Sequence, residues 1–187
     1  HFGHQAKRWN PKMKKFIYGK RNRLYIIDLE KTLDQIKKVQ NFMKDLISNK
    51  GVLLFVGTKK QAQIIVKSSA QALNMPFITE KWIGGMLTNF DNLKKRFEKY
   101  KSLKEQRESN GFSNYTKKEI VNVNKLIDKM KKKFDGVKDM SSLPDAVIIV
   151  DPKKEHLAVH ECLKMNIPVI ALVDTDTNPD VVDYPIP

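Results

Sequence analysis

Two aspartates near the end of the chain carry the strongest signal for catalysis. Asp174 and Asp176 follow an apolar run and are themselves followed by Thr177. After a buried strand, two carboxylates at this spacing can act as nucleophile and as acid/base in phosphoryl transfer. The same two carboxylates, joined by His1 and His4, would also offer an oxygen and nitrogen metal site.

The aspartate motif resembles the first motif of haloacid-dehalogenase-type phosphotransferases, but three features oppose that function. The motif leaves no room in this chain for the later motifs of that family, no strand offers the lysine of a phosphate clamp, and the positive charge of the chain would stay unexplained. We therefore predict no enzyme, no catalytic residue, no metal and no cofactor. A phosphotransferase and a metal site at Asp174 remain the alternatives.

A second candidate is the turn Gly57-Thr58-Lys59-Lys60, which follows the apolar run at 52–56. Phosphates often bind where a strand turns into a helix. A P-loop, however, needs Gly, four residues and then Gly-Lys-Ser/Thr. Thr58 stands where that lysine belongs, so we do not expect nucleotide hydrolysis. Lys59 and Lys60 can still contact an RNA phosphate.

Two histidines and a cysteine suggest no site. His156 and His160 are four residues apart on a predicted helix, but the Glu that follows the first His in zinc proteases is absent. We expect both to be solvated, with His160 beside Glu161 on the polar side. Cys162, the single cysteine, excludes an internal disulfide and is expected to be a small core residue.

Charge gives the clearest indication of function. The chain of 187 residues has a net charge of +14, and such an excess usually has a polyanionic partner. Residues 1–23 contain eight Lys or Arg and no acid, interleaved with aromatics such as Trp9 and Tyr18 that can stack on bases. We expect an extended or irregular basic arm. A basic module that binds a membrane or a protein is the alternative, although the arm lacks the apolar stripe of a membrane-bound helix.

The rest of the chain alternates between strand and helix patterns. We predict strands at 24–28, 52–56, 76–79, 145–151 and 168–174, with a helix from Thr32 to Gly51 and others after Thr58 and Pro152. Capping boxes at Thr32 and Thr58 would begin two of these helices. This order predicts a parallel sheet with helices on both faces.

The middle of the chain has a different period. Phe90, Leu93, Phe97 and Tyr100 are spaced by three and four residues, and a second apolar series runs from Ile120 to Phe134. Both are narrow seams typical of coiled coils. We therefore predict domains at 1–23 (basic arm), 24–86 with 137–187 (sheet domain) and 87–136 (antiparallel coiled-coil hairpin).

Several stretches together resemble a known family. They include His1-Phe2-Gly3-His4-Gln5, Arg8-Trp9-Asn10-Pro11-Lys12-Met13, Leu54-Phe55-Val56-Gly57-Thr58-Lys59-Lys60, Trp82-Ile83-Gly84-Gly85-Met86-Leu87-Thr88-Asn89 and Asp183-Tyr184-Pro185-Ile186-Pro187. The chain resembles the family of the second protein of the small ribosomal subunit, in its bacterial or organellar form. Because it begins without Met and stops in what looks like an interrupted loop, we expect it to be a piece of a longer protein.

The resemblance implies a flavodoxin-like sheet, no catalysis, and a place on the ribosome in a bacterium or an organelle. It also implies binding to small-subunit ribosomal RNA and to neighbouring small-subunit proteins. The residues that we expect to contact RNA are cations of the arm, the helix starts and the hairpin, with a few polar or aromatic neighbours. They are Lys7, Arg8, Trp9, Asn10, Lys12, Lys14, Lys15, Lys20, Arg21, Arg23, Lys59, Lys60, Trp82, Asn89, Lys94, Lys95 and Arg96.

Overall fold

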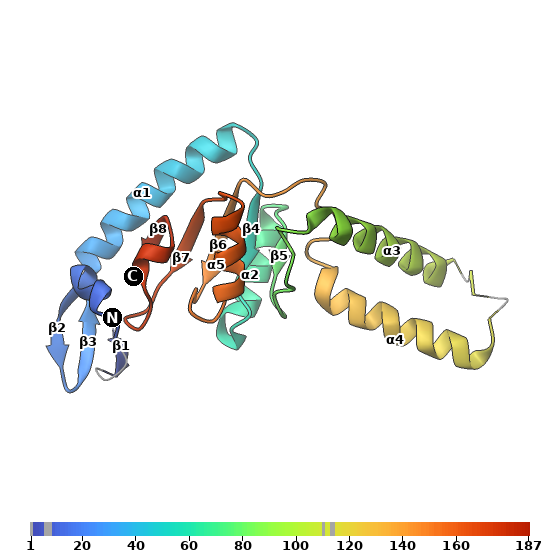
Figure 1. Ribbon diagram of the computed structural model, residues 1–187, viewed down its shortest axis with the longest axis horizontal. Helices are drawn as coiled ribbons and strands as arrows, with labels where there is room; N and C mark the ends of the chain where they lie inside the picture. The colour runs from blue at the N-terminus through green and yellow to red at the C-terminus, as the bar shows by residue number, and fades with distance from the viewer. Residues whose placement is uncertain (1, 6–8, 110, 113–114) are drawn as a thin grey trace.

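The structure is a computed structural model that describes residues 2–5, 9–109, 111–112 and 115–187. Figure 1 shows three parts along the long axis: a small sheet beside both termini, a central sheet flanked by helices, and a pair of long helices that projects from the far end.

The central sheet has five parallel strands: β4 (Leu53–Val56), β5 (Phe77–Ile78), β6 (Ala146–Val150), β7 (Val169–Leu172) and β8 (Tyr184–Ile186). Their order is β5-β4-β6-β7-β8, and each neighbouring pair is parallel. All four residues of β4 are buried, as expected for a strand covered on both faces. The predicted α/β class with a parallel sheet is confirmed.

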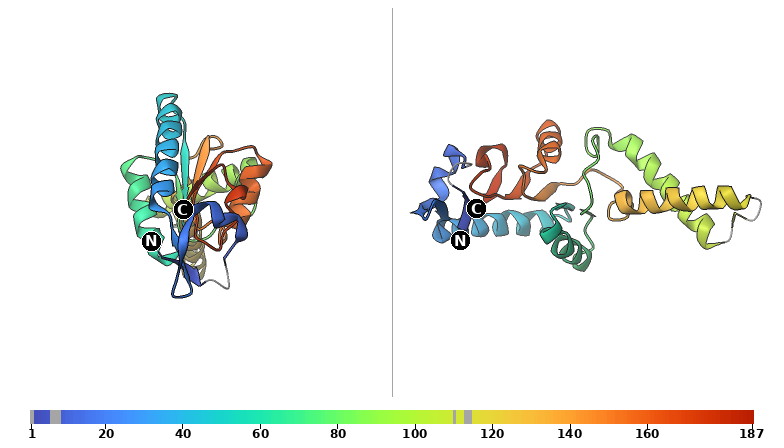
Figure 2. Two further views of the ribbon diagram at one scale, coloured as in Figure 1. Left: turned by 90° about the vertical axis from the view of Figure 1, so that its left-hand side faces the viewer. Right: turned by 90° about the horizontal axis from the view of Figure 1, so that it is seen from below.

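Three helices cover this sheet: α1 (Leu29–Ser48), α2 (Lys60–Ala72) and α5 (His156–Lys164). Figure 2 shows α1 and α2 on one face and α5 on the other. The connections that follow β4 and β6 therefore diverge to opposite faces, which makes the carboxyl edge between these two strands the switch point of the sheet.

Both predicted capping boxes are wrong. Helix α1 begins one turn before Thr32, because the Asp28 side chain accepts hydrogen bonds from the amides of Glu30 and Lys31. The Thr32 hydroxyl instead donates to the Asp28 carbonyl at 3.0 Å, inside the helix. Helix α2 has no side-chain cap at Lys59.

Helix α2 buries few of its apolar side chains against the sheet. Val66 and Ala70 are buried, whereas Ile65 is 66% exposed and Leu73 51% exposed. The helix approaches Gly57 closely: a Cβ on Gly57 would lie 2.8 Å from Cγ2 of Val66. Because Gly57 has no side chain, α2 can lie close to the end of β4 with Val66 against it.

In its described residues the basic arm is regular, and much of it is extended, which was one of the two forms expected. It forms β1 (Phe2–Gln5), a 3-10 helix η2 (Pro11–Phe16) and β2 (Ile17–Arg21), and β1 and β2 pair antiparallel with β3 (Leu24–Ile27). Strand β3, which was predicted, therefore belongs to this three-stranded sheet rather than to the parallel one. We call residues 9–27 the N-terminal module.

The last residues, 184–187, were expected to be an interrupted loop, but Tyr184–Ile186 form the edge strand β8, which follows another 3-10 helix, η3 (Pro179–Val181). Pro185 lacks an amide hydrogen, but an edge strand tolerates this. The amide of Val173 donates to the Ile186 carbonyl at 2.9 Å, and the ring of Tyr184 stacks on Phe42 of α1 with centroids 4.5 Å apart.

The projecting pair consists of α3 (Phe90–Glu108) and α4 (Lys117–Phe134), which lie side by side (Figures 1 and 2). All four predicted seam residues of α3 are buried, and Phe97 packs edge-on against Phe134 of α4 at 5.4 Å. A capping box between Thr116 and Glu119 begins α4. The root of this pair joins the core of the sheet domain in one apolar cluster.

Candidate nucleic-acid interface

The N-terminal module is fixed to the central sheet through η2. Asn10 caps η2 by accepting from the Lys12 amide at 3.0 Å, and its own amide donates to the Thr175 carbonyl at 2.8 Å. Met13 and Phe16 are buried in the main core. With one side of η2 anchored in this way, the lysines between Met13 and Phe16 face outwards.

The lysines of η2 differ in their partners. Lys12 and Lys15 both pair with Asp180 of η3, at 3.1 and 3.0 Å. These hydrogen bonds, from Lys15 and then from Lys12, hold the pKa of Asp180 below its ordinary value. Lys14 is exposed and has no ion pair within the described part of the chain. Lys14 is therefore the η2 cation that is most available to an external anion.

A tight turn presents further cations between β2 and β3. Arg21 pairs with Leu24 in register, which leaves Asn22 and Arg23 as a two-residue loop. Both have positive φ, 48° and 62°, as a type I′ turn requires. Asn tolerates this conformation, but Arg does not favour it. Arg23 thus occupies a strained position at an exposed tip, where a glycine would be less costly.

The aromatic residues of the module fall into two classes. The Trp9 ring contacts the Tyr25 ring with centroids 4.6 Å apart, and Lys20 lies 5.9 Å from the same Tyr25 ring. One face of Trp9 is therefore already covered. Tyr18 on β2 is 79% exposed and offers an open ring to an unpaired base.

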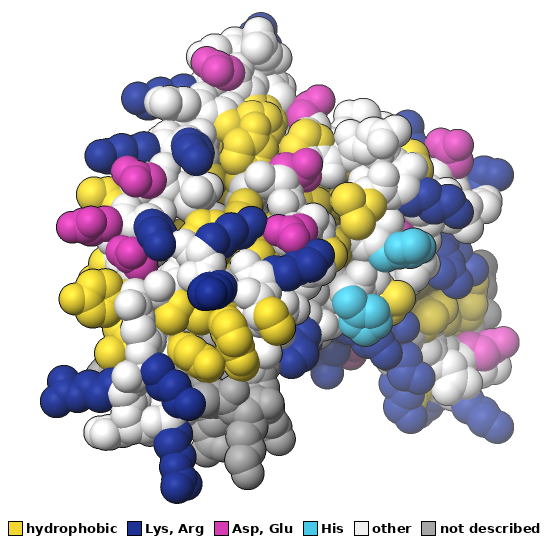
Figure 3. Space-filling model, turned by 60° about the vertical axis from the view of Figure 1, so that its left-hand side comes forward, with side chains coloured by type: hydrophobic (Ala, Val, Ile, Leu, Met, Phe, Trp, Pro, Cys, Tyr) yellow, Lys and Arg dark blue, Asp and Glu magenta, His cyan; other side chains and the backbone are white. Residues whose placement is uncertain are grey.

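Figure 3 shows Lys and Arg side chains spread over this face, with one group at its lower edge and another behind and to the right, toward the projecting helices. Lys60, Lys95 and Arg96 are exposed, and Lys94 donates to the Ser141 carbonyl at 3.4 Å. The predicted cations therefore lie in separate regions rather than in one patch.

The switch-point crevice, where such sheets bind ligands, is filled by the protein itself. The Thr58 hydroxyl donates to the buried Glu155 carboxylate, and the Lys154 ammonium donates to the Thr58 carbonyl at 2.9 Å. Lys59 pairs with Asp151 at 3.2 Å across the same edge. Lys59 is thus engaged, and the turn predicted as a possible phosphate contact is closed by internal bonds.

The aspartate motif shows a similar internal use. Asp174 accepts from the Thr175 amide at 2.6 Å, and Asp176 pairs with Lys153 at 2.6 Å. These bonds fix the loop after β7. His1 and the side chain of His4 lie outside the described residues, so the predicted metal alternative is untested there. Among the residues that are described, no group of three or more potential metal ligands is found.

A buried carboxylate organises the loop at 82–89. Glu161 of α5 is 7% exposed and accepts from Trp82 Nε1 at 2.9 Å, and from the amides of Gly85 and Leu87 at 2.8 and 2.9 Å. The Thr88 amide adds a bond at 3.2 Å. Burial raises the pKa of Glu161, but these hydrogen bonds outweigh it and the net pKa lies below its ordinary value.

This arrangement corrects two expectations. Glu161 does not share the polar side of α5 with the exposed His160, because it is buried with its carboxylate bonded to three amides of the 82–89 loop. Trp82, 5% exposed with its indole bonded inward, is a core residue that positions the loop and presents no face to a base. Asn89, the last residue of the loop and the N-cap of α3, is exposed and accepts from the Asn92 side chain at 2.6 Å.

The expected exposure of both histidines and the expected burial of Cys162 are confirmed. His156 and His160 are exposed. Cys162 is fully buried, and burial raises the pKa of its thiol to about 12, which makes it a poor nucleophile.

Comparison with known proteins decides the family. The sequence pattern of ribosomal protein S2 matches residues 1–187. The whole chain is 49% identical to the small ribosomal subunit protein uS2 of Nocardia farcinica, covering 66% of that protein, and 49% identical to that of Mycobacteroides abscessus, covering 68%. It is 51% identical to the protein of the same name from Rhodococcus erythropolis, again covering 66%. The chain belongs to the ribosomal protein S2 family.

This member of the ribosomal protein S2 family spans about two thirds of the length of these relatives. None of its described helices is long and apolar enough to cross a membrane. Of the predicted RNA-contacting residues, Lys7 and Arg8 lie outside the described residues. The structure brings Trp9, Lys20, Arg21 and Arg23 together around the small sheet, and sets Asn10, Lys12, Lys14 and Lys15 on η2.

Sequence reasoning missed two features of this S2-family protein. Asp180 neutralises two lysines, one of them 165 residues away, which no local pattern reveals. The end of α4 carries Lys131, Lys132 and Lys133 in its last turn, where the apolar seam of the same helix is the more conspicuous pattern. The run of three lysines is visible in the sequence and is a signal for an anionic partner.

Proposed function

We propose that this chain is a structural constituent of the small ribosomal subunit that binds its ribosomal RNA and carries out no chemistry. The observation that carries the proposal is the N-terminal module, which holds exposed Lys14, Arg21 and Arg23 and the open Tyr18 ring on a rigidly anchored support. Cations placed this way suit phosphate contacts, and the exposed ring suits stacking on an unpaired base.

The contact set of the proposal follows from the availability of each side chain. The core of the set consists of exposed cations: Lys14, Lys20, Arg21, Arg23, Lys60, Lys95 and Arg96. Lys7 and Arg8 are added from the sequence alone. Lys12, Lys15 and Lys59 can contribute only in exchange for their present carboxylate partners. Trp9, Asn10, Lys94 and Asn89 are proposed to position the RNA-facing segments, and Trp82 to hold the loop behind them.

The finer architecture is part of the proposal. We propose a basic arm that extends through β3 to residue 27, because β3 pairs with β1 and β2 and not with the parallel sheet. We further propose a flavodoxin-like body at 28–86 and 137–187 and a coiled-coil hairpin at 87–136. The alternating seam and the contact of Phe97 with Phe134 support the coiled coil. The hairpin, remote from the N-terminal module, would brace against RNA or a neighbouring small-subunit protein.

A charge-reversal experiment tests the proposal. Lys14→Glu with Arg21→Glu should weaken co-sedimentation of the full chain with small subunits, because two phosphate contacts become repulsive. The slope of log K against log salt should become shallower by about 0.7–0.9 for each phosphate that is no longer neutralised. Lys37→Glu with Lys38→Glu on α1 makes the same change in charge at exposed positions and serves as the control. Unchanged sedimentation of the module variant would overturn the proposal.

A further inference from the structure

The neck between the sheet domain and the hairpin has a pocket on each side. The neck is closed by the Phe77 amide, which donates to the Gly136 carbonyl at 2.9 Å. One pocket of about 620 Å³ and another of about 460 Å³ share Phe77, Asp135 and Gly136 in their walls. They are therefore two faces of the same junction.

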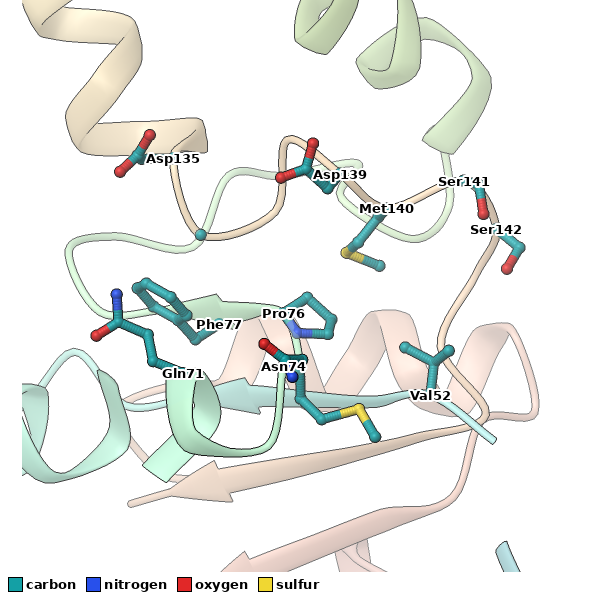
Figure 4. Close-up of a pocket in the computed structure, with 12 residues that line it drawn as sticks. Val52, Gln71, Asn74, Pro76, Phe77, Asp135, Asp139, Met140, Ser141 and Ser142 are labelled. Atoms are coloured by element: carbon teal, nitrogen blue, oxygen red, sulfur yellow. The ribbon is translucent and has the colours of Figure 1, made fainter. Parts of the chain in front are cut away.

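The two faces differ sharply in charge. The larger pocket is lined by Asp135, Asp139, two serines and apolar or amide residues, and no Lys or Arg is among its lining residues (Figure 4). The smaller pocket is lined by four lysines, Lys67 of α2 and Lys131, Lys132 and Lys133 of α4. We call this second face the neck groove.

The acids of the neck groove do not neutralise these lysines. Asp128 pairs with Arg107 at 3.3 Å, and Asp135 accepts from the Tyr100 hydroxyl and the Lys138 ammonium, each at 3.1 Å. Glu80 is the remaining acid in the wall. Within the described residues, none of the four lysines forms an ion pair, so the groove keeps most of its positive charge.

Stabilisation of α4 alone does not explain this cluster. A cation in the last turn of a helix interacts favourably with the helix dipole, and one suffices for that purpose. Successive residues of a helix point about 100° apart. These three consecutive lysines nevertheless all line one pocket, and a fourth lysine from α2 lines it as well. The four ammonium groups therefore surround a concave space, which a role in helix stability does not require.

We propose that the neck groove binds the phosphodiester backbone of RNA, at a site separate from the N-terminal module. This inference rests on the proposed function. Lysines act as flexible point charges toward phosphate, and the groove presents no arginine fork and no exposed aromatic ring for reading a base. The groove therefore positions a backbone without selecting a sequence. An acidic segment of a neighbouring protein is the competing occupant.

Lysine protection distinguishes the two occupants. Small subunits carrying the full-length protein are treated with an amine-reactive reagent, and modification of each lysine is measured by peptide mass spectrometry against the free protein. We expect severalfold protection of Lys67 and Lys131–Lys133 that disappears when the RNA is digested with nuclease. Protection that survives nuclease would identify a protein occupant and overturn the proposal.

The same experiment separates this inference from the proposed function. Co-sedimentation without protection of the groove lysines overturns the groove alone. A chain that fails to sediment with small subunits overturns the proposed function, and the groove with it.

A neutralised variant gives a second measurement. Lys131→Gln, Lys132→Gln and Lys133→Gln together remove three charges while keeping good helix formers, and circular dichroism checks that α4 is intact. The salt slope of binding to small-subunit ribosomal RNA should become shallower by about 2 to 3. The matched control is Lys37→Gln, Lys38→Gln and Lys44→Gln on α1, for which we expect no change. Equal slopes for the two variants would contradict a localised groove.

Discussion

Glu161 is the buried side chain that holds the 82–89 loop in place. Replacing it by Gln keeps the shape but turns one acceptor oxygen into a donor. That donor faces either Trp82 Nε1 and the Gly85 amide, or the amides of Leu87 and Thr88. Because buried donors are then left without partners, we expect a decrease of about 2–4 kcal/mol in the free energy of unfolding. Denaturant unfolding of the variant measures it. Glu98→Gln, at an exposed position of α3, is the control and should be near neutral.

The same residue predicts a pH dependence. Hydrogen bonds keep the pKa of Glu161 in the folded protein below its ordinary value of 4.5, although burial opposes them. The unfolded chain therefore takes up the proton more readily than the folded one. The stabilisation is complete above pH 4.5 and is lost as the pH falls through the lower, folded-state pKa. Glu161→Gln should flatten this part of the stability profile; an unchanged acid limb would contradict the assignment.

At Arg23, the requirements of stability and of RNA binding conflict. Its φ of 62° costs an L-residue about 1–2 kcal/mol. Glycine avoids this cost but loses about 0.5–1 kcal/mol more in chain entropy on folding. Arg23→Gly should therefore stabilise the fold by about 0.5–1 kcal/mol while weakening RNA binding. Arg21→Gly, two residues away in β2, removes the same charge but should destabilise the strand. Thermal unfolding and RNA binding of the pair test this; equal stability changes would refute the strain.

The sequence reveals the type of each functional side chain but not the residues with which it interacts. The cations of residues 1–23 are plain from composition, yet nothing nearby shows that Lys12 and Lys15 are neutralised by Asp180. Likewise, Glu161 appears polar on a helical wheel because the wheel does not include the loop that packs against α5. Pairings between residues distant in sequence depend on tertiary contacts, which local patterns do not encode.

Among the elements, the neck depends on a glycine. A Cβ at Gly136 would lie 2.2 Å from the Phe77 carbonyl oxygen, which belongs to the backbone of β5 and cannot turn away. Gly136→Ala should therefore force the neck apart and cost more than about 2 kcal/mol in unfolding free energy. Gly84, at the other root, has nothing within 4 Å of such a Cβ, so Gly84→Ala should be nearly neutral. Calorimetry compares the two; equal destabilisation would show that the contact is not rigid.

Elements were predictable where one local signal dominates. The apolar runs of β4, β6 and β7 and the seams of α3 and α4 were recognised because burial imposes a pattern on the residues themselves. β8 was missed because its Pro185 breaks the strand pattern, and only an edge position makes it acceptable. The small sheet was missed because its strands, with one face open to cations, show no clear alternation.

For the whole molecule, the two proposed RNA contacts lie far apart. Figure 1 places the small sheet of the N-terminal module at one end and the hairpin with its neck toward the other, separated by the central sheet. If RNA occupies both surfaces, the central sheet between them sets the distance between two RNA segments. That is a structural role in the literal sense, and it needs no cavity for a substrate. It also agrees with a switch-point crevice that is filled by Thr58, Glu155 and Lys154.

Independence of the two surfaces is testable as additivity. Lys14→Gln with Arg21→Gln should lower the magnitude of the salt slope by about 1.5, and the triple neck variant by about 2.5. Because distant sites couple weakly, the combined variant should lower it by about 4, and the decreases in binding free energy should add to within about 0.5 kcal/mol. RNA binding of the four proteins over a range of salt concentrations completes the cycle. If the combined variant binds no more weakly than either parent, both sets of cations serve one contact, and the central sheet does not hold two RNA segments apart.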